Sequence, residues 1–477
     1  MGSSPGTALI DILNDDALLH VFYLYRPFLL GEDKGGNTHL RGGETWVRGR
    51  WWYKLAQVCQ RWRNLIFGSA SYLGLSLVCA RGTPITDMLA HSPPLPLVVD
   101  FFDDNFDITA EDEEAVILAL NQRDRVHRVR LCIPASSLQK IIAAMDEEYP
   151  ILEYLILMPL KEDTSSILIL PETLQAPHLR HLSLVGFALP IGSRLLTTAV
   201  GLVTLSFFLN APSTYFHPNS LLHWISSMPQ LKTLVILFTF ATPNREIEKQ
   251  FMRTPITTPV TLPNLQIFRF CGVSAYLEAL VHRITTPHIG ELEIVFFNQL
   301  TFSIPRLLQF IDTTETLRFD SAKFQFLDNQ VSVQVYSRGE AEMKRFVVYV
   351  LCQHLDWQVS SAAQIYNSLG QMFSAVEHLT FGSDEHGRSS EEHNDVDRTE
   401  WRKLLRSFGN VKTLYIGNRL VEEFSRCLEL EEGELPLELL PELQELIYSR
   451  SGDTGDAFTS FINARHTAGH PVTLVPD

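Results

Sequence analysis

The stretch "PHLRHLSL" at residues 177–184 carries the pattern that decides the fold. Its last two leucines, Leu182 and Leu184, alternate with the polar His181 and Ser183, as in a strand with one buried face. Pro177 ends a preceding helix and favours an extended chain around it. The stretch therefore predicts a short strand that follows a proline turn.

The same pattern, P-x-[LI]-x-x-[LF]-x-[apolar], recurs along the chain. The six copies with proline are "PILEYLIL" (150–157), "PHLRHLSL" (177–184), "PQLKTLVI" (229–236), "PNLQIFRF" (263–270), "PHIGELEI" (287–294) and "PELQELIY" (441–448). Copies without the proline are "GLVTLSF" (201–207), "AVEHLTF" (375–381) and "NVKTLYI" (410–416), and weaker ones are "RVHRVRL" (125–131) and "TTETLRF" (313–319). Consecutive copies from Leu152 to Ile289 start 23 to 34 residues apart, which is typical of leucine-rich repeats.

Helical segments fill the gaps between copies. They are "NSLLHWISSM" (219–228), "SAYLEALVHRI" (274–284) and "IPRLLQFID" (304–312). Repeated strand–helix units require crossovers between parallel strands, so the expected fold is α/β, an irregular solenoid with strands on its concave face and helices on its convex face. Residues 320–375 lack a clear copy, and we expect a strand at 344–352 and a helix at 360–373 there.

The first 80 residues follow a different, helical pattern. Residues 8–25 read as a short helical pair, with Asn14 or Asp15 as the cap of the second helix. Residues 51–67 read as one amphipathic helix whose apolar stripe includes Val58, Cys59 and Trp62. A glycine-rich loop at 31–43 lacks the spacing of a phosphate-binding loop.

Composition argues against several classes of partner. The net charge of −16 repels phosphate backbones and anionic lipid, so we expect neither nucleic acid nor membrane as a partner. No apolar run reaches the length of a membrane helix, and no signal peptide is expected. The six cysteines are scattered and expected to be core residues rather than disulfide halves.

No motif of an enzyme or a cofactor site is present. The chain lacks a GxSxG elbow, an HExxH zinc motif and a glycine-rich phosphate turn, so we expect no catalytic residue and no cofactor. His386 and His393 lie in the charged stretch 382–398, which favours a solvated loop over a metal site. An enzyme whose site is assembled from scattered residues remains an alternative.

The N-terminal region resembles an F-box. "LNDDALLHVF" (13–22) matches the opening of the motif and "VCQRW" (58–62) matches its Val-Cys-x-x-Trp ending. Asn14 stands where the family has proline, Asp16 stands where it has glutamate, and an insertion at about 26–50 separates the halves. "GTPITDMLAHSPPLPLVVDF" (82–101), "HLDWQVSSAAQIYNSL" (354–369) and "FINARHTAGHPVTL" (461–474) extend the resemblance to F-box proteins of mushroom-forming fungi.

This resemblance implies a substrate-recognition adaptor of a Skp–cullin–F-box ubiquitin ligase, in which the F-box docks on a Skp-type linker and thereby on a cullin. A small helical unit cannot cover all of its own apolar surface, and a linker would cover the rest. The residues expected to face the linker, or to support that face, are Leu13, Leu18, Val21, Phe22, Leu55, Val58, Cys59, Trp62 and Leu65. The alternative for each is the internal core.

An unknown protein substrate is expected on the concave strand face. Side chains that flank the buried leucine of each copy point away from the core. They are Tyr154, His181, Arg269, Glu291, Glu293, Arg318, His378, Tyr415 and Glu445.

The expected domains are an F-box-like unit at 1–80, a linking or capping segment at 81–125, and the repeat solenoid with a C-terminal cap at 126–477. The expected location is the cytoplasm, the nucleus or both. A leucine-rich-repeat scaffold that binds a partner without a ubiquitin-ligase role is the alternative function.

Overall fold

The described residues have a mixed α/β fold with a large, mostly parallel β-sheet of 16 strands, which confirms the predicted α/β class, whereas the repeat solenoid stays a prediction. The computed structural model describes residues 13–26, 51–102, 108–160, 167–190, 192–239, 259–297, 304–314, 319–337, 344–352, 355–383, 398–430, 434–449 and 457–476. Outside these ranges lie nearly all of the expected insertion at 26–50, the candidate residue Arg318, and the charged stretch around His386 and His393. The chain divides into two compact units, 1–204 and 205–477, whereas the expected boundaries at 80 and 125 stay predictions.

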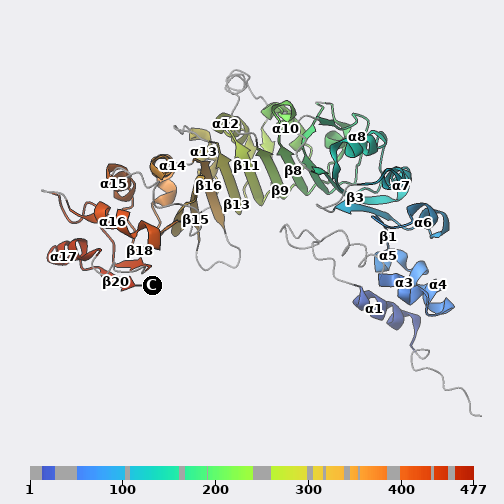
Figure 1. The fold of residues 1–477 in the computed structure, drawn as a ribbon, viewed down its shortest axis with the longest axis horizontal. Coiled ribbons are helices and arrows are strands. Elements are labelled where there is room, and N and C mark those ends of the chain that lie inside the picture. The colour runs from blue at the N-terminus through green and yellow to red at the C-terminus, as the bar shows by residue number, and fades with distance from the viewer. Residues whose placement is uncertain are drawn as a thin grey trace, which may run out of the picture. The chain divides into compact units, whose positions relative to one another are not determined.

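Unit 1 begins with a helical module. Its helices are α1 (Asp15–Tyr25), α3 (Trp51–Ala56), α4 (Gln60–Gly68) and α5 (Ala70–Leu73) (Figure 1). The predicted cap is confirmed, because Asn14 Oδ1 accepts a hydrogen bond of 2.8 Å from the Ala17 backbone N–H. Leu18 and Phe22 face inward from α1 and are buried, as are Ile66 of α4 and Leu73 of α5.

The prediction of one continuous helix over 51–67 is wrong. The chain leaves the helix after Ala56 and starts a new one at Gln60, because Cys59 adopts an extended backbone with φ of −157°. Its Sγ accepts a hydrogen bond of 3.4 Å from the Trp62 backbone N–H, so the thiol caps α4. The break removes Val58 and Cys59 from the expected apolar stripe and leaves both exposed.

The sheet of unit 1 is parallel. Its hydrogen-bonded strands, in spatial order, are β1 (Leu77–Ala80), β2 (Leu97–Phe102), β3 (Val126–Pro134), β4 (Tyr154–Leu160) and β6 (His181–Val185). The other elements are α6 (Ile85–His91), α7 (Ala110–Leu120), η2 (Arg123–Arg125), α8 (Ala135–Ala143), β5 (Leu168–Ile169), β7 (Phe187–Ala188) and α9 (Arg194–Thr198). The strands predicted from the copies at 125–131, 150–157 and 177–184 are confirmed, and β1 and β2 are strands that the repeat pattern missed.

Unit 2 continues the same strand–helix alternation. After β8 (Thr204–Leu209), its strands are β9 (Thr233–Phe238), β11 (Ile267–Gly272), β13 (Glu291–Phe296), β14 (Ser321–Phe326), β15 (Gln330–Tyr336), β16 (Arg345–Leu351), β17 (His378–Ser383), β18 (Thr413–Ile416), β19 (Glu445–Tyr448) and β20 (Thr473–Pro476), with a small pair β10 (Val260–Thr261) and β12 (Ile284–Thr285). The helices are η3 (Pro212–Thr214), α10 (Pro218–Ile225), α12 (Ser274–Val281), α13 (Pro305–Asp312), α14 (Leu355–Phe373), α15 (Arg398–Arg406), η4 (Asn418–Leu420), α16 (Val421–Leu428) and α17 (Thr459–Thr467). Among the described residues, no helix is long and apolar enough to cross a membrane.

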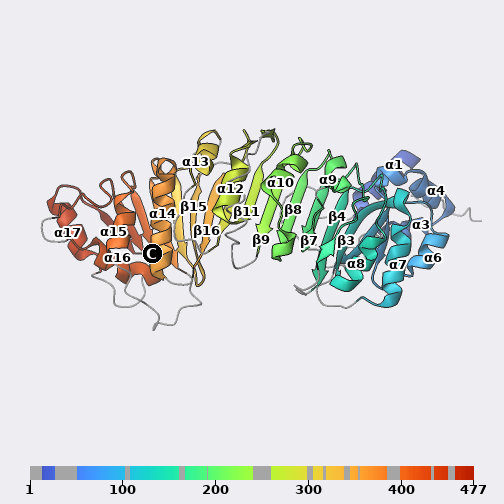
Figure 2. The ribbon, with the colours of Figure 1, turned by 90° about the horizontal axis from the view of Figure 1, so that it is seen from above.

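Alternation along strands such as β13 separates a core face from an open face. In β13, Leu292, Ile294 and Phe296 are fully buried, while Glu291 and Glu293 are partly exposed. The register keeps equivalent positions in line, so that Leu292 pairs with Phe268 of β11 and Phe346 of β16, both buried. In unit 2, helices α10, α12 and α14 lie over one face of the strands (Figure 2). The open face is the other one, to which Glu291 and Glu293 belong.

One hairpin pair interrupts the parallel order of unit 2, where solely parallel strands were expected. Strand β15 is antiparallel to both β14 and β16, so β16 rather than β14 pairs with β13. Two reversals restore the direction, and β14 pairs in parallel with β17. The chain leaving β16 must therefore pass two strands before it reaches β17, and the 19-residue α14 makes that crossing. This explains why residues 320–375 form the longest unit without a copy of the repeat.

Candidate functional site

The residues expected to face a linker divide by burial. Leu18 and Phe22 are buried in the helical module and support it from within. Leu55, Trp62 and Leu65 are partly exposed, and the Trp62 ring meets the Phe22 ring edge-on at 4.8 Å. The exposed members are Leu13, Val21, Val58 and Cys59.

Helix α1 carries a further exposed apolar residue that the sequence reading missed. Leu24 is 69% exposed, and it follows Ala17 and the half-exposed Val21 at spacings of four and three residues. These spacings place the three on one side of the helix, away from Leu18 and Phe22. The sequence pattern of Leu18, Val21, Phe22 and Tyr25 indicates a single apolar face of the helix and does not include Leu24.

A charged hydrogen bond fixes the start of α1 against α4. The Arg61 guanidinium donates to the Leu13 carbonyl oxygen at 2.6 Å and to Asp15 Oδ1 at 2.7 Å. Arg61 lies two residues beyond the Cys59 cap, so this bond links the Val58–Cys59 turn to the N-terminal end of α1. The exposed residues Leu13, Val21, Leu24 and Val58 are called the front apolar residues below.

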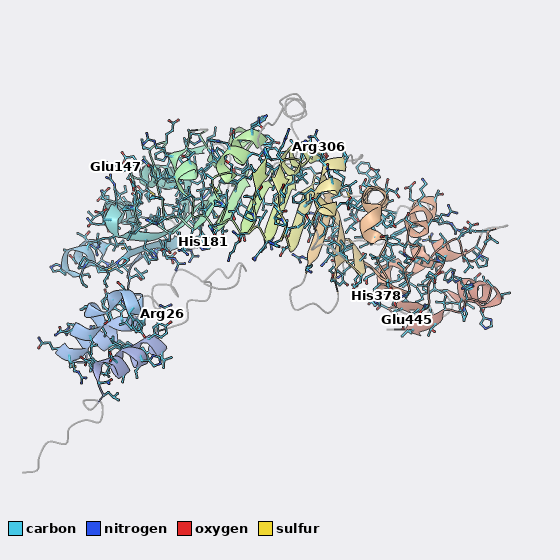
Figure 3. All side chains as sticks on the ribbon, turned by 180° about the vertical axis from the view of Figure 1, so that it is seen from behind. Arg26, Glu147, His181, Arg306, His378 and Glu445 are labelled. Atoms are coloured by element: carbon cyan, nitrogen blue, oxygen red, sulfur yellow. The ribbon has the colours of Figure 1, made fainter. Side chains whose placement is uncertain are left out.

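Two of the expected substrate residues lie together on the open face of unit 1. Tyr154 of β4 pairs in register with His181 of β6, and their rings are 5.4 Å apart. Arg128 of β3 pairs with Tyr154 on its other side, and its guanidinium lies 4.8 Å from the centre of the tyrosine ring. Figure 3 shows His181 on the side of these strands opposite the helices. The sequence reading missed Arg128, although the weak copy at 125–131 contained it.

We expect the imidazole of His181 to titrate below the ordinary range of histidine. Burial lowers its pKa, and the neighbouring guanidinium groups of Arg128 and Arg180 lower it further. Because the unfolded chain then binds the proton first, the contribution to stability falls as the pH drops through the pKa of an unfolded histidine. An NMR titration checks this, and Arg128→Gln should raise the pKa of His181. An unchanged pKa in that variant would show that Arg128 does not act on the imidazole.

Three other expected residues, Arg269, Glu291 and Glu293, form an ion-pair network with Arg345. Glu291 Oε1 lies 2.8 Å from Arg269 Nη2 and 2.9 Å from Arg345 Nη2. Glu293 Oε2 lies farther away, 3.4 Å from Arg269 Nε and 3.8 Å from Arg345 Nη2. The four charges cancel within the face of β11, β13 and β16. Burial and the nearby Glu293 also raise the pKa of Tyr349, which follows Arg345 on β16.

We expect Glu291→Gln to lower the free energy of unfolding by about 1 kcal/mol, because it weakens two short charged hydrogen bonds. Glu293→Gln is the matched variant on the same strand, and its longer contacts should make its effect smaller. Urea unfolding of the full chain measures both. Equal effects, or a larger effect at Glu293, would contradict the assignment of Glu291 as the central member of the network.

The remaining expected residues lie on other strands of unit 2. His378 of β17 and Glu445 of β19 occupy equivalent positions on either side of Thr413, and Tyr415 lies two positions further along β18 (Figure 3). All three are partly exposed on the open face. Strands β14 and β15 separate β17 from β16, the nearest strand of the ion-pair network.

The buried cysteines match the expectation of core residues. Cys59 is exposed, and the other five are buried without a disulfide. Burial raises the pKa of the Cys271 and Cys427 thiols to about 12, which keeps them protonated and unreactive. Within the described ranges, no group of His, Cys, Asp and Glu side chains is arranged to hold a metal ion.

Comparison with known proteins adds no relative. No protein-family model matches the chain, and no curated protein matches its sequence.

Proposed function

We propose that the chain is the substrate-recognition adaptor of a Skp–cullin–F-box ubiquitin ligase. In this proposal the helices within residues 13–75 are an F-box that docks on a Skp-type linker, and through it on a cullin. The strand–helix units are irregular leucine-rich repeats whose open face binds a protein substrate. The chain carries out no chemistry, because holding a substrate beside the ubiquitin-charged enzyme raises its effective concentration. It works in the cytoplasm, the nucleus or both.

The observation that carries the proposal is the exposure of the front apolar residues. Val21 is 50% exposed, Val58 is 59% exposed and Leu24 is 69% exposed, all within one small helical module. A large apolar side chain gains roughly 1.5–3 kcal/mol when it is fully covered. Val21 and Leu24 on α1, with Leu13 before it and Val58 in the turn before α4, suit an interface with the helices of another protein. Val58, Cys59 and Trp62, which match the end of the F-box motif, lie in and next to helix α4 of this module.

The proposal explains why the module is small yet well capped. Asn14 caps α1 and the Cys59 thiol caps α4, so both helices are stabilised locally without extra apolar burial. The bond from Arg61 to Asp15 and to the Leu13 carbonyl sets how the two helices meet. Because the caps and the Arg61 hydrogen bonds stabilise the module, its exposed apolar side chains stay available for a partner.

The test is binding between the purified full chain and a purified Skp-type linker, measured by coelution on size exclusion and by calorimetry. The proposal expects a one-to-one complex. A chain that is folded by circular dichroism but does not bind any Skp-type linker at micromolar concentration would refute the ligase role. The leucine-rich-repeat scaffold without a ubiquitin role would then be the better account.

A further inference from the structure

The open face of unit 1 holds a positively charged platform of one guanidinium and two rings, the rings being tilted by 45° to each other. It consists of Arg128, Tyr154 and His181, which occupy equivalent positions on β3, β4 and β6. The guanidinium lies 4.8 Å from the centre of the tyrosine ring, and the tyrosine and imidazole rings are 5.4 Å apart. A planar guanidinium that stacks on a ring keeps its N–H edge free for bidentate hydrogen bonds. We call these three residues the Arg128 platform.

Arg128 has no carboxylate partner among the residues that the structure describes. The contrast with its neighbours is direct, because Arg130 pairs with Asp100 at 3.5 Å and Arg269 pairs with Glu291 at 2.8 Å. Glu153, the residue before β4, has a carboxylate oxygen 3.4 Å from His127 Nε2, and its charge also acts on His181, where it raises the pKa against the effect of the two arginines. A partly buried guanidinium without a counterion is costly, and an incoming anion would relieve that cost.

The surroundings of the platform carry two further signals. The neighbouring Arg180 is exposed and adds positive charge, which is visible in its effect on the pKa of His181. Ile156 and Met158 follow Tyr154 on the same face of β4, and both are partly exposed. Two residues along a strand span about 6–7 Å, so the apolar side chain of Ile156 lies next to the platform on the same face of β4.

We propose that the Arg128 platform binds an acidic side chain, a carboxylate or a phosphate, in an extended segment of a partner protein, with an apolar side chain two residues away on Ile156. This rests on the proposed function and assigns a chemical class to its substrate. One acid can pair with the Arg128 guanidinium through a bidentate contact, and the exposed Arg180 nearby adds to the positive charge that attracts it. A polyanion such as nucleic acid does not match, since the chain as a whole carries a net charge of −16.

The test uses three short fluorescein-labelled peptides in a common glycine–serine host. Each has a leucine, and two residues before it an aspartate, a phosphoserine or an asparagine. Fluorescence anisotropy with the full chain should show that at least one acidic peptide binds about tenfold more tightly than the asparagine peptide. The stronger of the two acidic peptides identifies the source of the negative charge.

Variants of Arg128 and Arg194 distinguish binding at the platform from a general effect of positive charge. Arg128→Gln should abolish the preference for acid, and Arg128→Lys should retain part of it, because the charge remains while the planar fork is lost. Arg194→Gln is the matched control: it removes the same charge from an exposed position on α9 of the same unit and should leave the preference intact. Circular dichroism of each variant confirms folding.

Three results would overturn the inference: equal binding of all three peptides, no binding by any of them, or an equal loss in Arg194→Gln. Linker binding is measured on the same preparations, so that the two proposals can fail separately. A chain that prefers acidic peptides but does not bind the linker loses the ligase role and keeps this site. A chain that binds the linker but shows no preference keeps the ligase role and loses this site.

Discussion

The double variant Val21→Asp with Val58→Asp is expected to weaken binding to a Skp-type linker by about 100-fold or more, because it places two charges in a surface that binding would desolvate. Both valines are at least half exposed in the free chain, so the variant should fold normally. Calorimetry with the purified linker measures the loss. Leu18→Ala is a poor substitute, since Leu18 is fully buried and its truncation would cost about 2–5 kcal/mol of folding stability.

The control for this experiment is Val200→Asp. Val200 is 53% exposed, which is between the values of Val21 (50%) and Val58 (59%), and it follows α9 in the same unit. We expect this substitution to leave linker binding unchanged. If it weakened binding as much as the double variant, the front apolar residues would have no special role.

The largest expected effect on stability comes from Arg465 in α17. Its side chain is fully buried, and its two Nη groups donate to the backbone carbonyl oxygens of Pro436, Leu440, Pro441 and Leu443 at 2.9–3.4 Å. The segment it holds includes Leu440, whose φ of +51° lies in the left-handed region and needs support from its surroundings. Arg465→Ala removes all the guanidinium donors from these carbonyls, of which Leu440 keeps only the Leu443 backbone N–H, and should lower the free energy of unfolding by about 3–5 kcal/mol.

Urea unfolding of the full chain, followed at several wavelengths, measures this effect. His466→Ala is the matched control on the next residue, which is exposed, and it should change stability little. Arg465→Lys should lie between the two, because an ammonium group retains part of the hydrogen bonding without the fork. A change below about 1 kcal/mol in Arg465→Ala would contradict the assignment of this side chain as the clamp of residues 436–443.

The strands that the sequence predicted are those in which apolar and polar residues alternate after a fixed motif. Strands β1 and β2 escaped because all four residues of β1 and five of the six in β2 are buried, so no alternation marks them. The hairpin β14–β15 has the alternation, in "SAKFQF" and "QVSVQVY", and a short turn between the two runs. The hairpin belongs to no copy of the repeat. Its antiparallel pairing could be predicted only from the two alternating runs and the short turn between them at residues 327–329.

The candidate site could be predicted in part. Alternation placed Glu291, Glu293 and Arg269 on the open face, but their pairing depends on which strands become neighbours and in what register. Arg345 reaches Glu291 from a strand 54 residues further along, and the reversed order of β14 to β16 creates that neighbourhood. The break at Cys59 could not be predicted from the sequence either. The apolar periodicity continues through residues 55–66, although Cys59 ends the helical backbone and caps α4 with its thiol.

Amide hydrogen exchange of the full chain, with and without the Skp-type linker, tests the central claim most directly. The account predicts slower exchange on binding in α1 and around α3 and α4, where the front apolar residues lie, and unchanged exchange in the strands of unit 2. Protection confined to the strands, with α1 and α4 unaffected, would contradict it, and so would a folded chain that shows no protection anywhere.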